Sequence, residues 1–212
     1  MRAAVFAAAV AIAGAVAVFA GGCGGSQAVT LGDEWPEKVP DYQDTKDRWT
    51  RHDRAYQDVD LVIDAHATLK SPEWRAAYAG AKARQAKLSP AARATLFDEE
   101  RRAANEFIEI QLIVATHDYP AMDFSSNDSS MWKMTLTGDD GREVAATSVK
   151  QDNRARTEIS TWFPELSPFH KAYVMRFPKV TADGQPLVTS ASSRLELRIG
   201  SALGAVKMVW SR

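Results

Sequence analysis

Alternating apolar and polar residues form the dominant pattern of this chain, and this pattern predicts β-strands. It is clearest at residues 60–70 and 107–116, where an aliphatic side chain occupies nearly every second position. Successive side chains of a strand point to opposite faces of a sheet, so such a run buries one face and exposes the other. Shorter runs of the same kind occupy residues 132–136, 173–177, 195–199 and 206–210. We expect each of these segments to form a short strand.

Turn residues between these segments indicate that neighbouring strands run antiparallel. The Gly-Asp-Asp-Gly sequence at residues 138–141 is a strong hairpin signal with residues 143–149 as the returning strand, and Asp-Gly at 183–184 marks another turn. Residues 48–56 fit either a helical or an alternating period, and we interpret them as a strand that turns at residues 57–58 into the next one. In total the sequence predicts eight short strands.

Two helix starts interrupt the strand pattern. Ser71 and Ser89 are each followed by a proline, which places a hydroxyl at the N-cap and proline at the first helical position, where its missing N–H has no cost. Residues 72–104 are therefore expected to form a helical hairpin with a thin apolar stripe. A thin stripe packs onto a larger body and does not make a core of its own.

The order and spacing of these elements predict a mainly β (α+β) fold. Short strands separated by turns favour an antiparallel β-sandwich-like body over a parallel sheet. The helical hairpin at about residues 72–104 is an insertion into that body, and we expect the domain to extend over residues 48–212.

The N-terminal region has a different pattern, which is typical of a secretory signal. Arg2 is followed at residues 3–20 by a run without charged or polar side chains, and small residues precede Cys23, the only cysteine of the chain. This order resembles the lipobox of bacterial lipoproteins, in which the cysteine is acylated, although Ala20 stands where that motif usually has leucine. We expect residues 1–22 to be removed and Cys23 to carry the lipid.

Two alternatives remain open at this stage: cleavage without acylation, and retention of residues 3–20 as a transmembrane helix. About 20 apolar residues are enough to cross a bilayer. Alanine dominates the run, however, and its small apolar surface would hold such a helix weakly in the membrane. Beyond the run, residues 24–47 combine glycine, serine and proline without a sustained apolar period, so residues 23–47 are expected to be the lipidated cysteine and a flexible tether.

Charge and cysteine content exclude several classes of function. The chain has 26 basic and 27 acidic residues, and this balance supplies no broad electrostatic field for nucleic acid. Once Cys23 is acylated, no thiol remains for a disulfide, a metal site or a nucleophile. Neither a Gly-x-Ser-x-Gly elbow nor a phosphate-binding glycine loop occurs. The sequence therefore predicts a non-enzymatic protein without a cofactor and without a nucleic-acid partner.

Four segments of the predicted body carry a resemblance to known proteins. They are Trp49-Thr50-Arg51, the run from Ala67 to Trp74, Met131-Trp132-Lys133 and the run from Phe163 to Pro178. These segments resemble a group of uncharacterised lipoproteins of Gram-negative bacteria, and the likeness covers most of residues 48–210. The resemblance implies no activity, because none is assigned to that group, but it favours the strand interpretation of residues 48–56.

Histidine and aspartate residues near two predicted strands suggest an alternative function as a metal-dependent hydrolase. Asp64 and His66 share the polar face of one strand, and His117 and Asp118 follow the end of another. If the two strands pair, these four side chains could converge on one metal ion. Zinc requires three or four ligands in tetrahedral geometry, and no local His-x-x-x-His pair is present. We therefore expect hydrogen-bonded or solvated histidines and no bound metal.

Residues 162–170 combine two prolines with several aromatic side chains. Such a loop can present Trp162 and Phe169 to a protein partner, because aromatic residues dominate the energy of many interfaces. It can also turn them inward to close one end of the sandwich, and the general tendency of large aromatics to pack favours this second interpretation.

The function expected from the sequence is that of a membrane-anchored envelope lipoprotein, acting as a binding or structural module. The membrane is contacted through the lipid on Cys23, and the expected partner is another envelope protein. Because Gly24 and not aspartate follows the cysteine, the resemblance to lipoproteins implies the outer membrane, with the domain facing the periplasm.

Overall fold

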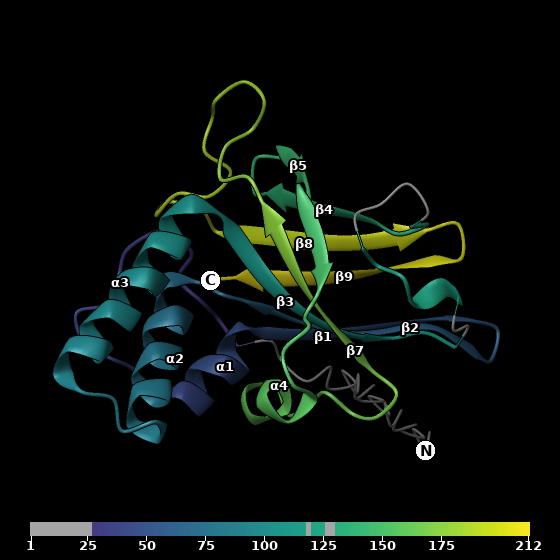
Figure 1. The fold of residues 1–212 in the computed structure, drawn as a ribbon. Helices are drawn as coiled ribbons and strands as arrows, with labels where there is room; N and C mark the ends of the chain where they lie inside the picture. The colour runs from purple at the N-terminus through teal and green to yellow at the C-terminus, as the bar shows by residue number, and fades with distance from the viewer. Residues whose placement is uncertain (1–26, 118–119, 126–129) are drawn as a thin grey trace, which may run out of the picture.

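The computed structural model describes residues 27–117, 120–125 and 130–212, which form two β-sheets and a group of helices (Figure 1). The helices are α1 (Tyr42–Trp49), α2 (Pro72–Gln85), α3 (Pro90–Glu106) and α4 (Arg156–Trp162), and a 3₁₀ turn spans Pro120–Met122. The strands are β1 (Thr50–Gln57), β2 (Asp60–Leu69), β3 (Ile108–Ala115), β4 (Lys133–Gly138), β5 (Glu143–Ala145), β6 (Ser148–Gln151), β7 (Lys171–Phe177), β8 (Arg194–Ser201) and β9 (Gly204–Ser211).

The two sheets stack face to face, which confirms the predicted mainly β, sandwich-like fold. The larger sheet has the strand order β1-β2-β3-β7-β6, the smaller one has the order β5-β4-β8-β9, and every pairing is antiparallel. The alternating apolar residues of both sheets meet in one core. Burial of each large apolar side chain contributes roughly 1.5–3 kcal/mol. Fully buried examples are Ile63, Leu112, Met175, Leu197 and Trp210.

The segment predicted as one returning strand at residues 143–149 forms two strands in different sheets. β5 pairs with β4, whereas β6 pairs with β7 of the larger sheet. The change occurs between Ala146, whose N–H donates to Met134 O (3.1 Å), and Thr147, whose N–H donates to Arg176 O (2.9 Å). The described part of the chain therefore has nine strands in place of the eight predicted.

The helical hairpin predicted at residues 72–104 is confirmed as α2 and α3, which lie side by side at one end of the sheets (Figure 1). Ser71 Oγ accepts the Trp74 N–H at 3.1 Å and Ser89 Oγ accepts the Ala92 N–H at 3.3 Å, so both serines cap their helices as expected. α2 is the more deeply packed helix, with Trp74 only 2 % exposed, whereas Ala104 is the one buried residue of α3.

Residues 27–47 pack against the body, so the prediction of a flexible tether is wrong for this part of the chain. Val29 and Leu31 are buried in the core, and the Val29 N–H donates to a carbonyl of β9 at 2.8 Å. Val39 lies against α2 at Gly80, where a Cβ atom would come within 2.4 Å of Val39 Cγ1. Isolated apolar residues in a polar stretch have no period, which is why the sequence did not reveal this packing.

The end of this segment forms α1, which the sequence did not predict. Asp41 caps the helix by accepting the N–H of Gln43 at 2.8 Å. β1 consequently begins at Thr50 and not at Arg48, because Arg48 belongs to the last turn of α1. The remainder of the strand predicted at residues 48–56 is confirmed.

Among the described residues, no helix has the length and apolar character that a membrane crossing requires. The predicted signal peptide at residues 1–22 and Cys23 lie outside the described residues, as does Asp118 of the alternative metal site. The other three residues of that alternative, Asp64, His66 and His117, are described.

Candidate functional site

Three histidines and one aspartate lie together on the outer face of the larger sheet, the face turned away from the sandwich core. His52 comes from β1, Asp64 and His66 come from β2, and His170 comes from the loop before β7. On β2 the residues between them, such as Ala65, point into the core and are fully buried. The polar side of the predicted strand at residues 60–70 therefore contributes two members of the cluster, as the alternation indicated.

An irregularity in the β1–β2 hairpin determines which side chains meet. The pairing skips Val62, since Leu61 is opposite Tyr56 and the next paired residue, Ile63, is opposite Ala55. Such a β-bulge shifts the register by one residue and so changes which residues of the two strands share a face. Because of this shift, His52 lies directly opposite His66.

Two imidazole rings and the carboxylate of Asp64 contact one another in this cluster. The rings of His52 and His66 stack, with their centroids 4.0 Å apart and their planes 5° from parallel. Asp64 Oδ1 lies 2.7 Å from His52 Nε2 and 3.7 Å from His66 Nε2, and Asp64 Oδ2 lies 3.0 Å from Arg54 Nε. One ligand atom from each of His52, Asp64 and His66 lies within 4.8 Å of the other two. These are residue types that bind zinc.

The environment keeps the His66 ring uncharged at neutral pH. The pKa of His66 is lowered to about 4, chiefly by burial; the neighbouring His52 also lowers it, and by more than the Asp64 carboxylate raises it. Burial also opposes ionisation of Asp64, but hydrogen bonds from Arg54 and His52 outweigh it, so the pKa of Asp64 is lowered. The cluster thus combines an ionised carboxylate with a neutral imidazole, which is the form of histidine that binds metal ions.

His170 lies at the border of the cluster. Its ring meets the His66 ring edge-on, with centroids 5.9 Å apart and planes at 67°. Ser167 Oγ lies 2.6 Å from His170 Nδ1 and holds the ring in place. His170 Nε2 is buried and has no hydrogen-bond partner within the described part of the chain. A buried nitrogen without a partner is costly, so this atom calls for a physical explanation.

The structure separates His117 from the residues with which the sequence grouped it. β2 and β3 pair, as the alternative required, and Asp64 is opposite Ala115. His117 lies beyond the end of β3, where it is exposed and its N–H donates to Leu61 O at 3.3 Å. Ile113 is the residue opposite His66. His117 lies four residues beyond Ile113, which places it about 13 Å from His66 along the strand direction.

His52 is the residue of the cluster that the sequence interpretation overlooked. A signal for it was present, because the predicted strand at residues 48–56 turns at 57–58 into the strand at 60–70, and such a hairpin brings its two strands side by side. His52 and His66 then lie at similar distances from the turn. Counting from the turn places the two residues near each other along the hairpin, but without the bulge it puts Ala65 opposite His52 and His66 on the other face.

Trp162 and Phe169, which the sequence grouped as partner-contacting residues, occupy opposite environments. Trp162 is 7 % exposed, and its ring packs edge-on against Tyr42 with centroids 5.2 Å apart. The Tyr42 hydroxyl donates to Trp162 O at 2.7 Å, which adds a polar contact to the packing. Phe169 is 80 % exposed. Of the two residues, only Phe169 is accessible to a partner.

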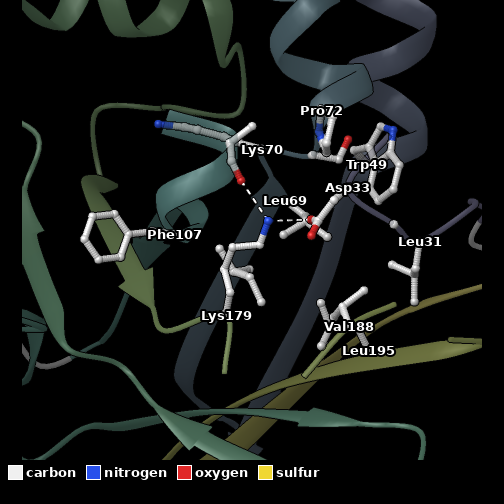
Figure 2. Close-up of a pocket in the computed structure, with 14 residues that line it drawn as sticks. Leu31, Asp33, Trp49, Leu69, Lys70, Pro72, Phe107, Lys179, Val188 and Leu195 are labelled. Carbon is white, nitrogen blue, oxygen red and sulfur yellow. Dashed lines mark hydrogen bonds and ion pairs between the residues drawn. The ribbon is translucent and has the colours of Figure 1, made fainter. Parts of the chain in front are cut away.

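A small cavity lies between the N-terminal segment, the start of α2 and the smaller sheet (Figure 2). Figure 2 shows Lys179 reaching toward Asp33, and Lys179 Nζ lies 2.6 Å from Asp33 Oδ1 and 3.1 Å from Ala104 O. The cavity measures about 40 Å³. Sites for small organic ligands typically measure roughly 300–1,000 Å³, whereas a few tens of Å³ are enough only for water. We therefore assign no organic ligand to it.

Comparisons of the chain with protein-family models, with curated proteins and with solved structures found no match. The function is therefore inferred from the sequence pattern and from the geometry of the sites.

Proposed function

We propose that the chain is a lipid-anchored lipoprotein of the cell envelope whose β-sandwich domain acts as a non-enzymatic binding or structural module. The observation that carries the proposal is the pattern before Cys23: a basic start at Arg2, an uncharged apolar run at residues 3–20, and small residues before the only cysteine. The resemblance of the body to uncharacterised lipoproteins of Gram-negative bacteria supports it. Gly24 after the cysteine favours the outer membrane, with the domain facing the periplasm.

The construction of the domain is compatible with an oxidising compartment. No cysteine follows Cys23, so no thiol of the domain can form an incorrect disulfide there. The domain relies on packing instead, and the side chains of Trp49, Trp74 and Trp210 are each at most 2 % exposed. Large buried aromatics of this kind contribute much of the stability of a core.

The anchoring part of the proposal predicts how the chain partitions between detergent and water. The wild-type chain is expected in the detergent phase of a Triton X-114 separation, because an acyl chain adds about 0.8 kcal/mol of membrane affinity for each buried CH₂ group. Cys23→Ser removes the acylation site and is expected to abolish lipid labelling and to leave an unprocessed precursor. Ser26→Ala, which keeps the cysteine, is the control. Equal labelling of wild type and Cys23→Ser with radioactive palmitate would contradict the anchoring.

The binding part of the proposal assigns the partner contact to the loop that carries Phe169. The base of this loop is fixed, because Phe163 and Leu166 are buried in the core. Arg156 of α4 donates to the carbonyl oxygens of Ser167 and His170 and so bridges the rest of the loop. A loop whose backbone is already ordered loses little entropy on binding, which favours contact with a protein partner. We therefore expect Phe169 to contact another envelope protein.

Site-specific photocrosslinking in cells tests this contact. A photoreactive phenylalanine analogue at position 169, before the start of β7, is expected to give a discrete crosslinked band. The same analogue at Val180, beyond the end of β7, is expected to give none. Val180 is itself 49 % exposed, so exposure alone does not account for the expected difference. Equal crosslinking at the two positions, or none at position 169, would contradict the assignment. Phe169→Ala should change the free energy of unfolding by less than about 0.5 kcal/mol.

A further inference from the structure

We infer that His52, Asp64 and His66 form a binding site for one divalent transition-metal ion of the zinc type. The site goes beyond the proposed anchoring and binding function, and it uses residues that neither role requires. The two histidines supply nitrogen ligands and the aspartate supplies an oxygen ligand, a set that suits zinc and its neighbours better than calcium or magnesium, which prefer oxygen. Three protein ligands leave one position of a tetrahedral ion open for water or for a group of a partner.

The distances from the Asp64 carboxylate to the two histidines are close to those that zinc requires. Ligand atoms that bind Zn²⁺ at 2.0–2.2 Å in tetrahedral geometry lie about 3.3 Å from one another. Here Asp64 Oδ1 is 2.7 Å from His52 Nε2 and 3.7 Å from His66 Nε2. Each separation therefore differs from the required value by roughly half an ångström. Movements of this size need only small rotations of side chains and leave the strands unchanged.

The β1–β2 pairing holds the ligands while leaving one of them free to adjust. The paired backbones of β1 and β2 fix the positions from which His52 and His66 extend. The two rings are now parallel, so their lone pairs do not converge and one ring must tilt. The His52 side chain is 38 % exposed, and rotation of a histidine about its terminal torsion has a low barrier. His52 is therefore the ligand expected to move.

His170 supports the assignment as a neighbour of the site. Its Nε2 atom is buried without a hydrogen-bond partner in the described residues, and its ring lies edge-on to His66. A water molecule bound to the metal ion in the open position would offer a hydrogen-bond partner for this nitrogen. Ligand shells of zinc sites commonly make such outer contacts, which orient the bound groups.

Arg54 opposes metal binding and thereby supplies a specific test. Its guanidinium lies 3.0 Å from Asp64 Oδ2, so its positive charge repels a divalent cation at Oδ1. The Arg54 side chain is 48 % exposed, so it can move into solvent when a metal ion binds. Arg54→Gln is therefore expected to strengthen zinc binding by about three- to tenfold, an effect that non-specific binding elsewhere on the protein would not produce.

Isothermal titration of the full chain in detergent with ZnCl₂, after removal of metal by a chelator, tests the site. We expect one saturable Zn²⁺ per chain. His52→Ala and Asp64→Asn should each weaken binding by at least about tenfold, since even the loss of an outer contact costs 10- to 100-fold. His117→Ala, which removes an exposed histidine beyond the end of β3, is the matched control and should bind as the wild type does. Substitution of Co²⁺ should produce the strong visible absorption of a four-coordinate ion.

Two results would overturn the inference. One is the lack of saturable 1:1 binding by the wild-type chain, and the other is wild-type affinity in both His52→Ala and Asp64→Asn. Thermal unfolding of each variant controls for misfolding. The test relies chiefly on His52→Ala, because His52 is partly exposed and its loss should leave the fold intact. Neither result depends on Cys23, so failure of the metal site and failure of the lipid anchor are distinguishable.

Discussion

Glu109→Gln is expected to lower the free energy of unfolding by about 3 kcal/mol. Glu109 lies on the outer face of β3, is 8 % exposed, and is surrounded by cations. Lys70 Nζ lies 2.8 Å from Oε1, Arg75 Nη2 lies 3.4 Å from the same oxygen, and Arg176 Nε lies 2.9 Å from Oε2. Removal of one partner from a buried ionic group costs about 3–5 kcal/mol, because the remaining charges stay buried without compensation. Glu100, which pairs with Arg75 at 2.6 Å, retains part of the network.

The pH dependence of stability provides a second measure of the same contact. Burial opposes ionisation of Glu109, but the charges of Lys70 and Arg75 and the hydrogen bonds from Lys70 and Arg176 lower its pKa from 4.5 to about 2. A carboxylate with a lowered pKa stabilises the fold above its unfolded pKa, and this contribution is lost as the pH falls through the folded value. Through Glu109 alone, the wild type should therefore lose about 3 kcal/mol as the pH falls from 4.5 to about 2.

Urea unfolding at several pH values measures both effects. Glu109→Gln should be less stable at pH 7 and should show a correspondingly smaller loss of stability in acid. Glu99→Gln, an exposed substitution on α3, is the control and should follow the wild-type curve. A Glu109→Gln variant with wild-type stability at pH 7 would show that the network does not hold the helical hairpin to the sheet.

Arg51→Met is expected to lower the free energy of unfolding by about 3 kcal/mol and to release the N-terminal segment. The buried guanidinium donates to carbonyl oxygens of three separate segments: Nη2 to Gln27 (2.8 Å), Nη1 to Arg48 (2.6 Å) and Thr50 (3.0 Å), and Nε to Val209 (2.6 Å). Methionine fills similar space but donates nothing, so these partly buried carbonyls each lose a hydrogen-bond donor. Each such loss costs about 1–3 kcal/mol, reduced where water can enter.

Limited proteolysis distinguishes local release from general destabilisation. Trypsin should cleave Arg51→Met after Lys38 faster than it cleaves the wild type, under conditions in which the rest of the domain resists digestion. Arg102→Met on the exposed face of α3 is the matched control and should leave the rate unchanged. Equal cleavage rates after Lys38 in wild type and Arg51→Met would contradict the role of Arg51 in fastening this segment.

Local signals explain most of what the sequence revealed about the fold. The aliphatic alternation at residues 107–116 identified β3, and the Ser71 and Ser89 caps identified α2 and α3, because period and cap chemistry depend on neighbouring residues. The division of residues 143–149 between two sheets was not predictable in this way. It depends on which distant strands, β4 or β7, offer free backbone groups at that point.

The packing of residues 27–47 was not predictable either, because it also depends on distant strands. Val29 is buried because β9 lies beside it, and nothing in the local sequence indicates that contact. Two residues of the candidate metal site, Asp64 and His66, were predictable as neighbours, since they share one face of a predicted strand. His52 was missed because its place depends on the β-bulge at Val62. A regular register would put Ala65 opposite His52 and would turn His66 to the other face.

The measurement that tests the lipoprotein proposal most directly is the mass of the tryptic peptide that contains Cys23, taken from the chain purified from membranes. Trypsin cleavage after Lys38 should yield a peptide that begins at Cys23 and carries the added mass of a lipid on that residue. A peptide that extends from Ala3 to Lys38 with an unmodified cysteine, or one that begins elsewhere without lipid, would contradict the lipid anchor.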